Sequence, residues 1–169
     1  MNHQKIKENL RVNVDVFKYL FQSVSDEQAR WKPGEDKWSI LEVINHLYDE
    51  EREDFRFRIK WVLERPDEIP PPFNPINWVT DHNYMQQDYS VMLEKFFKER
   101  ESSLIWLKSL ENANWNNSFE HPKLGTMSAK YFLNNWLAHD YLHIRQIVKL
   151  KFDYLNNQFE ENLDYAGIW

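Results

Sequence analysis

Apolar side chains recur at intervals of three or four residues along most of this chain, in four long stretches. This interval places them on one face of an α-helix, so each stretch predicts an amphipathic helix. The first stretch covers residues 4–23, and its apolar face consists of Ile6, Leu10, Val14, Phe17 and Phe21. A short helix is expected next, with Ser25 as its N-cap and an end before Pro33 and Gly34.

The second stretch covers residues 38–64 and carries two adjoining stripes of side chains. Ser39 and Glu42 have the spacing of a capping box, in which a hydroxyl and a carboxylate bind backbone amides at a helix start. One stripe is apolar, and the other holds two polar residues among apolar ones: Val43, His46, Glu50, Phe57 and Trp61. Pro66 is expected to end this helix, because proline lacks the amide proton that would continue it.

The third helix is expected to begin at His82 or Asn83 and to end at Leu110. The fourth is expected over residues 128–151. Its stripe mixes aromatic, apolar and imidazole side chains, namely Phe132, Trp136, His139, His143, Gln146 and Leu150. Both helices follow from the same three- and four-residue spacing.

The segments between these helices predict two long loops, over residues 66–81 and 112–127. Within the second loop, residues 119–125 form either a small hairpin or an irregular turn. Loops of this length in a compact domain often act as lids or binding segments. The proline-rich residues 70–78 therefore predict either a cover over a pocket or a structural patch, and the sequence leaves the two equally open. The tail, residues 156–169, is expected to add a short helix that closes against the bundle.

Four long helices joined by connections of moderate length predict an all-α fold, a four-helix bundle with short extra helices. The 169 residues contain only three glycines, and no repeat or polar linker divides them. A length near 170 suits a single domain with one core. We therefore expect residues 1–169 to form one bundle domain.

The formal net charge of the chain is −6, and its basic residues are interleaved with acidic ones. This distribution argues against a nucleic-acid-binding surface. No apolar run is long enough to span a bilayer, and no secretory signal is recognised at the N-terminus. Cysteine is absent, which excludes disulfides, thiolate metal ligands and a cysteine nucleophile. The expected location is the cytoplasm.

Three histidines lie on the helical stripes predicted to face the interior. His139 and His143 are four residues apart, so both imidazoles lie on one helix face and can reach one cation. His46 lies on the inner stripe of the second helix. Neutral imidazole binds divalent metals, and helix bundles often hold metal sites in their cores. From the pattern alone, a hydrogen-bonded pair without metal is as well supported for His139 and His143, and a core role is the commoner one for His46.

The run from Trp31 to Leu47, which includes Lys37-Trp38-Ser39-Ile40 and His46, combines with the spacing His139-x3-His143-x2-Gln146. Together these motifs resemble the DinB-like family over most of the chain. The resemblance implies a four-helix bundle with a three-histidine site for a divalent metal, zinc or nickel, and frequent dimers. By this resemblance His46, His139 and His143 match the metal-ligand positions. One departure is Ile144-Arg145-Gln146, where many relatives carry Arg-Gly-Gln.

The resemblance also implies a function, a metal-dependent transferase that adds a low-molecular-weight thiol such as bacillithiol to electrophilic small molecules. Two alternatives stay open, a metal-dependent hydrolase and a non-catalytic, stress-related metal-binding protein. The partners expected are a small-molecule substrate and a second copy of the chain. The homodimer is suggested by the resemblance and by the high aromatic content.

Two further residues are candidates for roles beside the metal. Glu50, one turn after His46, is positioned to carry a proton or to orient a ligand imidazole, although a solvated or salt-bridged carboxylate is the commoner role. Gln146, one turn after His143, is positioned to hydrogen-bond a metal-bound group, and a packing role is equally open. The acidic residues 49–54 are expected on a solvated face. His82, His121 and His3 are expected outside the site.

Overall fold

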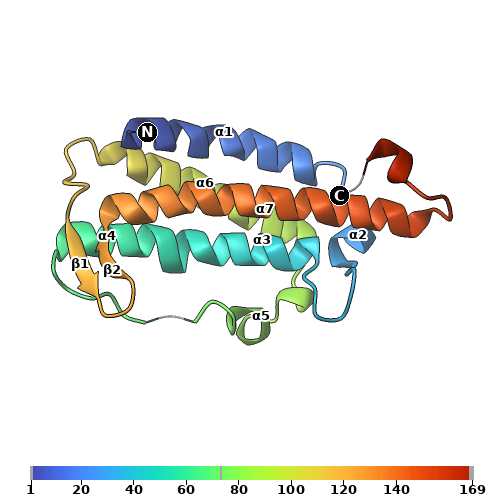
Figure 1. Ribbon diagram of the computed structural model, residues 1–169, viewed down its shortest axis with the longest axis horizontal. Coiled ribbons are helices and arrows are strands. Elements are labelled where there is room, and N and C mark those ends of the chain that lie inside the picture. Colours follow the sequence, from blue (N-terminus) through green and yellow to red (C-terminus); the bar gives the residue numbers. More distant parts are fainter. Residues whose placement is uncertain (1, 73, 168–169) are drawn as a thin grey trace.

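The computed structural model describes residues 2–72 and 74–167, and its long helices form a bundle (Figure 1). Over these residues the long helical segments are α1 (His3–Phe21), α6 (Tyr89–Ser109), α7 (Ala129–Gln158) and a continuous rod made of three parts. The rod consists of α3 (Ile40–Asp49), the π-helix η1 (Glu50–Phe55) and α4 (Arg56–Glu64). The predicted all-α four-helix bundle is therefore confirmed.

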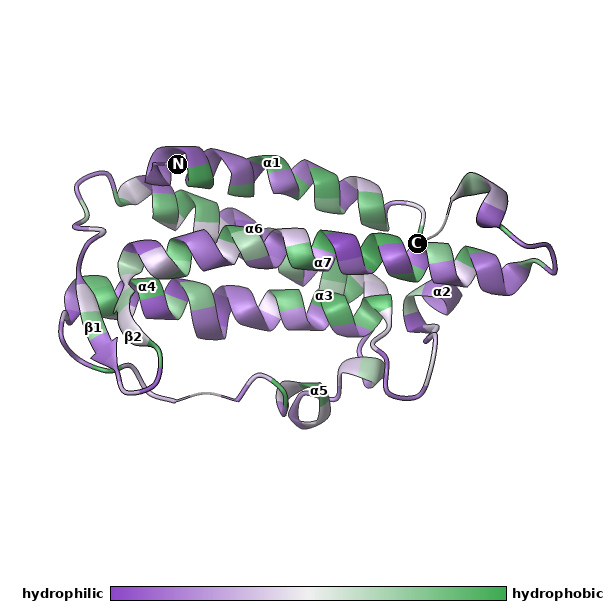
Figure 2. Cartoon of the chain, in the orientation of Figure 1, coloured by the Kyte–Doolittle hydropathy of each residue, from purple (hydrophilic) through white to green (hydrophobic). Residues whose placement is uncertain are grey.

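Hydrophobic and hydrophilic residues alternate along the long helices (Figure 2), and the apolar stripes are buried inside the bundle. They form two clusters. One cluster lies near the start of α7 and includes Leu10, Ile59, Leu133 and Trp136. The other lies near the start of α3 and includes Phe17, Leu41, Ile44, Phe96 and Ile147. Burial of such side chains is the main stabilising contribution, about 1.5–3 kcal/mol for each large one.

Side-chain caps begin several of these helices as the sequence predicts. The Ser39 hydroxyl accepts a hydrogen bond from the Glu42 amide at 3.2 Å, and the Ser39 amide donates to the Glu42 carboxylate at 2.7 Å. The predicted capping box at the start of α3 is thus confirmed. Ser25 caps α2 (Asp26–Arg30), and Ser128 caps α7.

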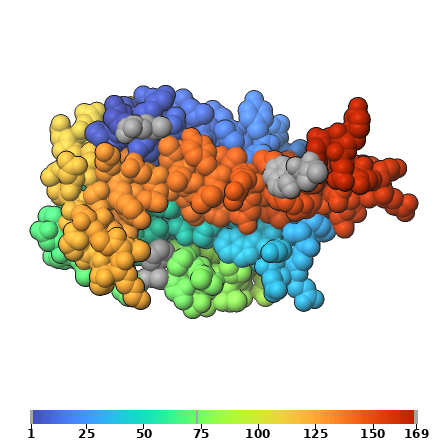
Figure 3. Space-filling model, viewed as in Figure 1, coloured from blue at the N-terminus to red at the C-terminus, as the bar shows by residue number. Residues whose placement is uncertain are grey.

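The remaining elements are short. Strands β1 (Ser118–His121) and β2 (Gly125–Ser128) pair in an antiparallel hairpin, with Ser118 opposite Ser128 and His121 opposite Gly125. The loop after Pro66 contains α5 (Trp78–Asp81) and η2 (Tyr84–Gln86), and the tail contains η3 (Asp164–Ala166). In the space-filling view, the hairpin, α5 and the start of α3 lie along one side of α7 (Figure 3).

Two predicted helix boundaries were wrong. The third long helix begins at Tyr89 rather than at His82 or Asn83. Asn83 has a left-handed backbone with φ +48°, which breaks a helix there, and the Asp88 side chain supplies the cap by accepting from the Val91 amide at 2.9 Å. The fourth helix continues past residue 151 to Gln158, because no proline or glycine interrupts it.

The tail was predicted to close against the bundle with a short helix. A short 3-10 helix, η3, is present, but residues 159–167 contain no buried side chain. Residues 168 and 169, the end of that prediction, lie outside the described residues. None of the helices described is both long enough and apolar enough to cross a bilayer.

Candidate metal centre

The three histidines singled out by the sequence converge on one point. His139 Nε2 lies 3.2 Å from His46 Nε2 and 3.0 Å from His143 Nε2. One nitrogen from each ring lies within 4.8 Å of the other two. His46 and His143 are buried, and His139 is half-buried. The structure therefore brings together residues that are 93 positions apart in the chain.

Helix geometry and aromatic packing hold these rings in place. His139 and His143 are one turn apart on α7, and α3 presents His46 to them. The Trp38 ring packs edge-on against His46 with centroids 4.9 Å apart. Phe55, at the end of η1, packs against His139 at 5.1 Å. The histidines are thus restrained by neighbouring rings on both sides of the cluster.

The environment keeps all three imidazoles neutral. Burial lowers the pKa of His46 to about 3 and that of His139 to about 2, and repulsion from the neighbouring imidazoles adds to the effect. Burial also lowers the pKa of His143. Neutral imidazole is the form that binds metals, so the cluster carries free lone pairs at neutral pH.

The donor set fits a divalent metal ion. Nitrogens bound to a tetrahedral zinc ion at about 2.0–2.1 Å lie roughly 3.3–3.4 Å apart, close to the separations found here. His143 Nδ1 donates to Gln146 Oε1 at 2.8 Å, which fixes the tautomer and leaves the Nε2 lone pair directed at the other histidines. His46 Nδ1 is buried with no hydrogen-bond partner among the described residues.

Glu50 lies beside the cluster, on the first turn of η1. Its Oε1 is 3.7 Å from His46 Nε2, and the side chain is buried. Burial, followed by the charge and hydrogen bond of Asp54, raises the pKa of Glu50 to about 9. At neutral pH this carboxyl therefore holds a proton. The π-helical segment begins at Glu50, one turn after His46, and such segments are often found at functional sites.

The expectation that the acidic residues 49–54 lie on a solvated face was wrong for all of them except Glu53, which is exposed. Asp49, Glu50, Glu51 and Asp54 are all buried. They are tolerated because each has a partner: Asp54 pairs with Arg58, and Asp49 accepts from Tyr84 at 2.7 Å.

His82 also has a partner that the sequence did not reveal. Its Nδ1 lies 2.6 Å from the Asp49 carboxylate, three residues beyond His46 in the chain. His82 and His121 are absent from the converging cluster, in agreement with the prediction for them. Since the contact joins residues 33 positions apart, no local pattern could have found it.

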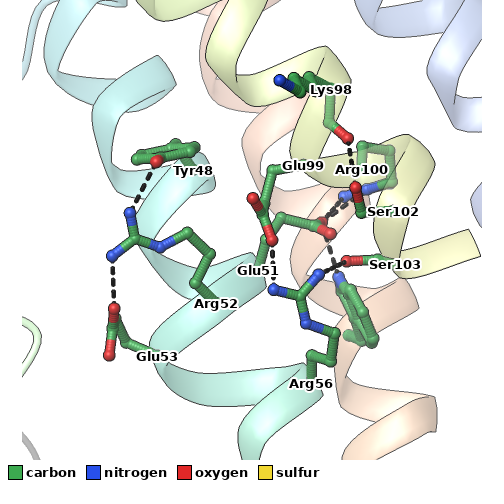
Figure 4. A network of polar contacts seen from close by, with 11 residues as sticks. Tyr48, Glu51, Arg52, Glu53, Arg56, Lys98, Glu99, Arg100, Ser102 and Ser103 are labelled. Atoms are coloured by element: carbon green, nitrogen blue, oxygen red, sulfur yellow. Dashed lines mark hydrogen bonds and ion pairs between the residues drawn. The ribbon is translucent and has the colours of Figure 1, made fainter. Parts of the chain in front are cut away.

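A buried ion-pair network lies next to the cluster, and Figure 4 shows part of it. Arg100 on α6 donates to Asp140 through two hydrogen bonds of 2.8 and 2.7 Å, and to Glu51 at 2.6 Å. Trp136 and Asn13 also donate to these two carboxylates. The network links α1, η1, α6 and α7, and Asp140 directly follows His139. It therefore fixes the helices that carry the histidines.

A cavity of about 460 Å³ lies beside the end of η1, and its walls include none of the three clustered histidines. Phe55, Phe132, Met127 and Leu124 form apolar walls, and Pro70, Pro71 and Pro72 lie along it. We call it the apolar cavity. Phe55 also contacts His139, so one ring both lines this cavity and packs against the histidine cluster. The prediction of a cover over a pocket thus agrees with the position of residues 70–72.

Comparison with known protein families gives a match to the DinB superfamily over residues 9–147. The chain belongs to the DinB superfamily. The matched part of the chain contains all three histidines, Glu50 and Gln146, so the family assignment covers the whole candidate site.

Individual relatives are distant. "Putative metal-dependent hydrolase OB0782" of Oceanobacillus iheyensis is 24% identical over 128 residues, 75% of this chain and 73% of that protein. The uncharacterized protein YuaE of Bacillus subtilis is 23% identical over 141 residues, 77% of this chain and 87% of that protein. The solved structure of YfiT from Bacillus subtilis, described as a probable metal-dependent hydrolase with an unusual four-helix bundle topology, matches with a TM-score of 0.75. The match has 19% identity and covers 88% of this chain and 85% of YfiT, which shows a shared fold.

Proposed function

We propose that this chain is a metal-dependent enzyme in which His46, His139 and His143 bind one zinc or nickel ion. The observation that carries this proposal is the convergence of three neutral imidazoles, two buried and one half-buried, on one point. The names of two relatives, which refer to metal-dependent hydrolases, support a metal at this place in the family.

The reaction we propose is the transfer of a low-molecular-weight thiol to an electrophilic small molecule. An ion held by three protein ligands would keep at least one position open, and there it would lower the pKa of a thiol or water to give a nucleophile. Hydrolysis by water is the second candidate, and the naming of relatives as hydrolases favours it. A non-catalytic metal-binding role is the third.

The chain itself supplies three further parts of the proposed mechanism. Glu50, 3.7 Å from His46 Nε2 and inside the protein, is placed to hold a proton at its carboxyl and to donate it. Gln146 orients His143 through the hydrogen bond to Nδ1. The apolar cavity, which Phe55 lines, offers apolar walls to an electrophile with an apolar body.

Mass spectrometry of reaction mixtures separates these candidates. Zinc-loaded and nickel-loaded protein is incubated with an electrophile such as monobromobimane, with and without added thiol, and with an activated ester. A transferase accelerates thiol addition to the electrophile, and His143→Ala abolishes the acceleration. Ester turnover without thiol that is lost in the same variant supports the hydrolase. If neither activity exceeds that of the variant, the catalytic proposal fails.

A homodimer and a cytoplasmic location remain proposals as well. The dimer rests on the family resemblance and on aromatic residues that α7 exposes, such as Tyr131 and Tyr141. Light scattering coupled to size-exclusion chromatography gives the mass directly, and the mass of a single chain would exclude the dimer.

A further inference from the structure

A second cavity, of about 680 Å³, adjoins the histidine cluster on the side opposite to the apolar cavity. His143 and Gln146 form part of its wall, and so does Trp38, whose ring packs against His46. Because α3 and α7 run in opposite directions (Figure 1), Trp38 meets the residues that follow His143 in α7. The cavity therefore contacts one candidate ligand, His143, directly, and a second, His46, through the Trp38 ring.

Three cationic side chains line this cavity, Lys37, Arg145 and Lys149, against a single carboxylate, Asp153. Lys149 and Asp153 pair with each other. Among the residues that the structure describes, the Lys37 and Arg145 side chains form no hydrogen bond and no ion pair. Two uncompensated positive charges thus face the cavity in a chain whose net charge is −6. We call it the cationic cavity.

The remaining walls of the cationic cavity are apolar. They come from Pro33, Trp38, Leu142 and Leu150. Ligand sites commonly combine apolar walls with a few convergent polar groups that fix orientation. A small molecule with a carbon skeleton and one or two carboxylates matches this combination, since guanidinium and ammonium groups both bind carboxylates.

We propose that Lys37 and Arg145 form an anion-binding subsite, which takes the carboxylate group of a small organic substrate and places its remainder at the histidine cluster. The inference rests on the proposed function only in so far as it calls the bound molecule a substrate. The cavity and its charges do not depend on the metal. Lys37 and Arg145 are binding residues in this proposal. Lys37 precedes Trp38 in the family motif, and Arg145 lies in the segment after His143 where this chain departs from many relatives. The mechanism proposed above assigns no role to either residue.

The test uses the zinc-loaded full chain and three probes: succinate, mercaptosuccinate and 2-mercaptoethanol. Isothermal titration calorimetry measures binding to wild type, Lys37→Gln, Arg145→Gln and the double variant. The matched control is Lys95→Gln, an exposed lysine on α6 outside both cavities that loses the same charge. Both cavity residues are exposed, so the variants are expected to fold.

The proposal predicts that each cavity variant weakens mercaptosuccinate or succinate binding by about tenfold, with a further loss in the double variant and less than twofold in the control. Binding of the neutral 2-mercaptoethanol should be unchanged, and carboxylate binding should weaken as salt is raised. Equal affinity in wild type and the double variant, an equal loss in the control, or no binding of either carboxylate probe would overturn it.

Two further measurements, competition between the probes and the spectrum of cobalt-substituted protein, decide which substrate carries the carboxylate. They also test the proposed thiol transfer separately from the subsite. In one outcome, succinate displaces mercaptosuccinate but not 2-mercaptoethanol, and mercaptosuccinate gives a thiolate band in cobalt-substituted protein. This outcome assigns the carboxylate to the thiol substrate. Succinate that binds together with either thiol assigns the carboxylate to the second substrate. Both results support the subsite. If no thiol gives a thiolate band in cobalt-substituted protein, the proposed thiol transfer fails but the subsite does not. Succinate binding still measures the contribution of Lys37 and Arg145.

Discussion

Arg100 and Asp140 form a two-armed ion pair inside the bundle, with hydrogen bonds of 2.8 and 2.7 Å, and Asp140 is the residue directly after His139. Both side chains are almost completely buried. The pair therefore connects the position of α6 to the turn of α7 that carries the candidate metal ligand. A charged group without its partner at this depth is costly, so the network has a measurable effect on stability.

Replacing Arg100 by Met should lower the free energy of unfolding by about 3–5 kcal/mol, because Glu51 and Asp140 then remain buried without a cation. Urea denaturation of metal-free protein measures this loss. The matched control is Arg56→Met, which breaks the more exposed pair with Glu99 and should cost only about 1 kcal/mol. Equal losses in the two variants would mean that the buried network has no special role.

Gln146→Ala should weaken zinc affinity by about 10- to 100-fold, because His143 loses the acceptor that fixes its tautomer. Competition with a chromophoric chelator gives the affinity. Gln158→Ala, at the exposed end of the same helix, serves as the control and should bind zinc like wild type. An unchanged affinity in Gln146→Ala would assign Gln146 a packing role.

The contribution of His46 and His139 to the stability of the metal-free protein should fall with acid below pH about 6.5, the ordinary histidine pKa. The pKa values of His46 and His139 are lowered in the fold, so below 6.5 the unfolded chain binds protons that the native chain does not. Their contribution is present above 6.5 and declines as pH falls towards about 3 and 2. The buried carboxyls of Glu50, Glu51 and Asp54 act in the opposite sense, because burial raises their pKa values and so favours the fold at low pH. For Glu50 that contribution declines as pH rises towards about 9.

His139→Ala isolates the histidine effect, since Glu50 is present in both proteins. Between pH 6 and 4 the variant should lose about 1.4 kcal/mol less stability per pH unit than wild type, the effect of one proton. Denaturation at several pH values with a chelator present provides the two slopes. Parallel slopes would show that His139 takes up a proton in the native state.

The helices and the paired spacing of His139 and His143 could be predicted because both follow from local periodicity. The place of His46 beside them depended on a family motif, since the sequence alone gives no distance between two helices. The buried acidic residues escaped prediction for the same reason. Glu51 looks solvated in its own segment, and only Arg100, 49 positions away, makes its burial possible. The start of the third helix was misplaced because the helical spacing does not reveal the left-handed backbone of Asn83.

Metal content measures the central claim most directly. Protein purified without an affinity tag or nickel column, dialysed and then supplied with zinc, should hold one zinc ion per chain by elemental analysis. His46→Ala, His139→Ala and His143→Ala should each lose that ion, and His121→Ala, outside the cluster, should keep it. Wild-type protein without metal, or ligand variants that keep a full equivalent, would contradict the account.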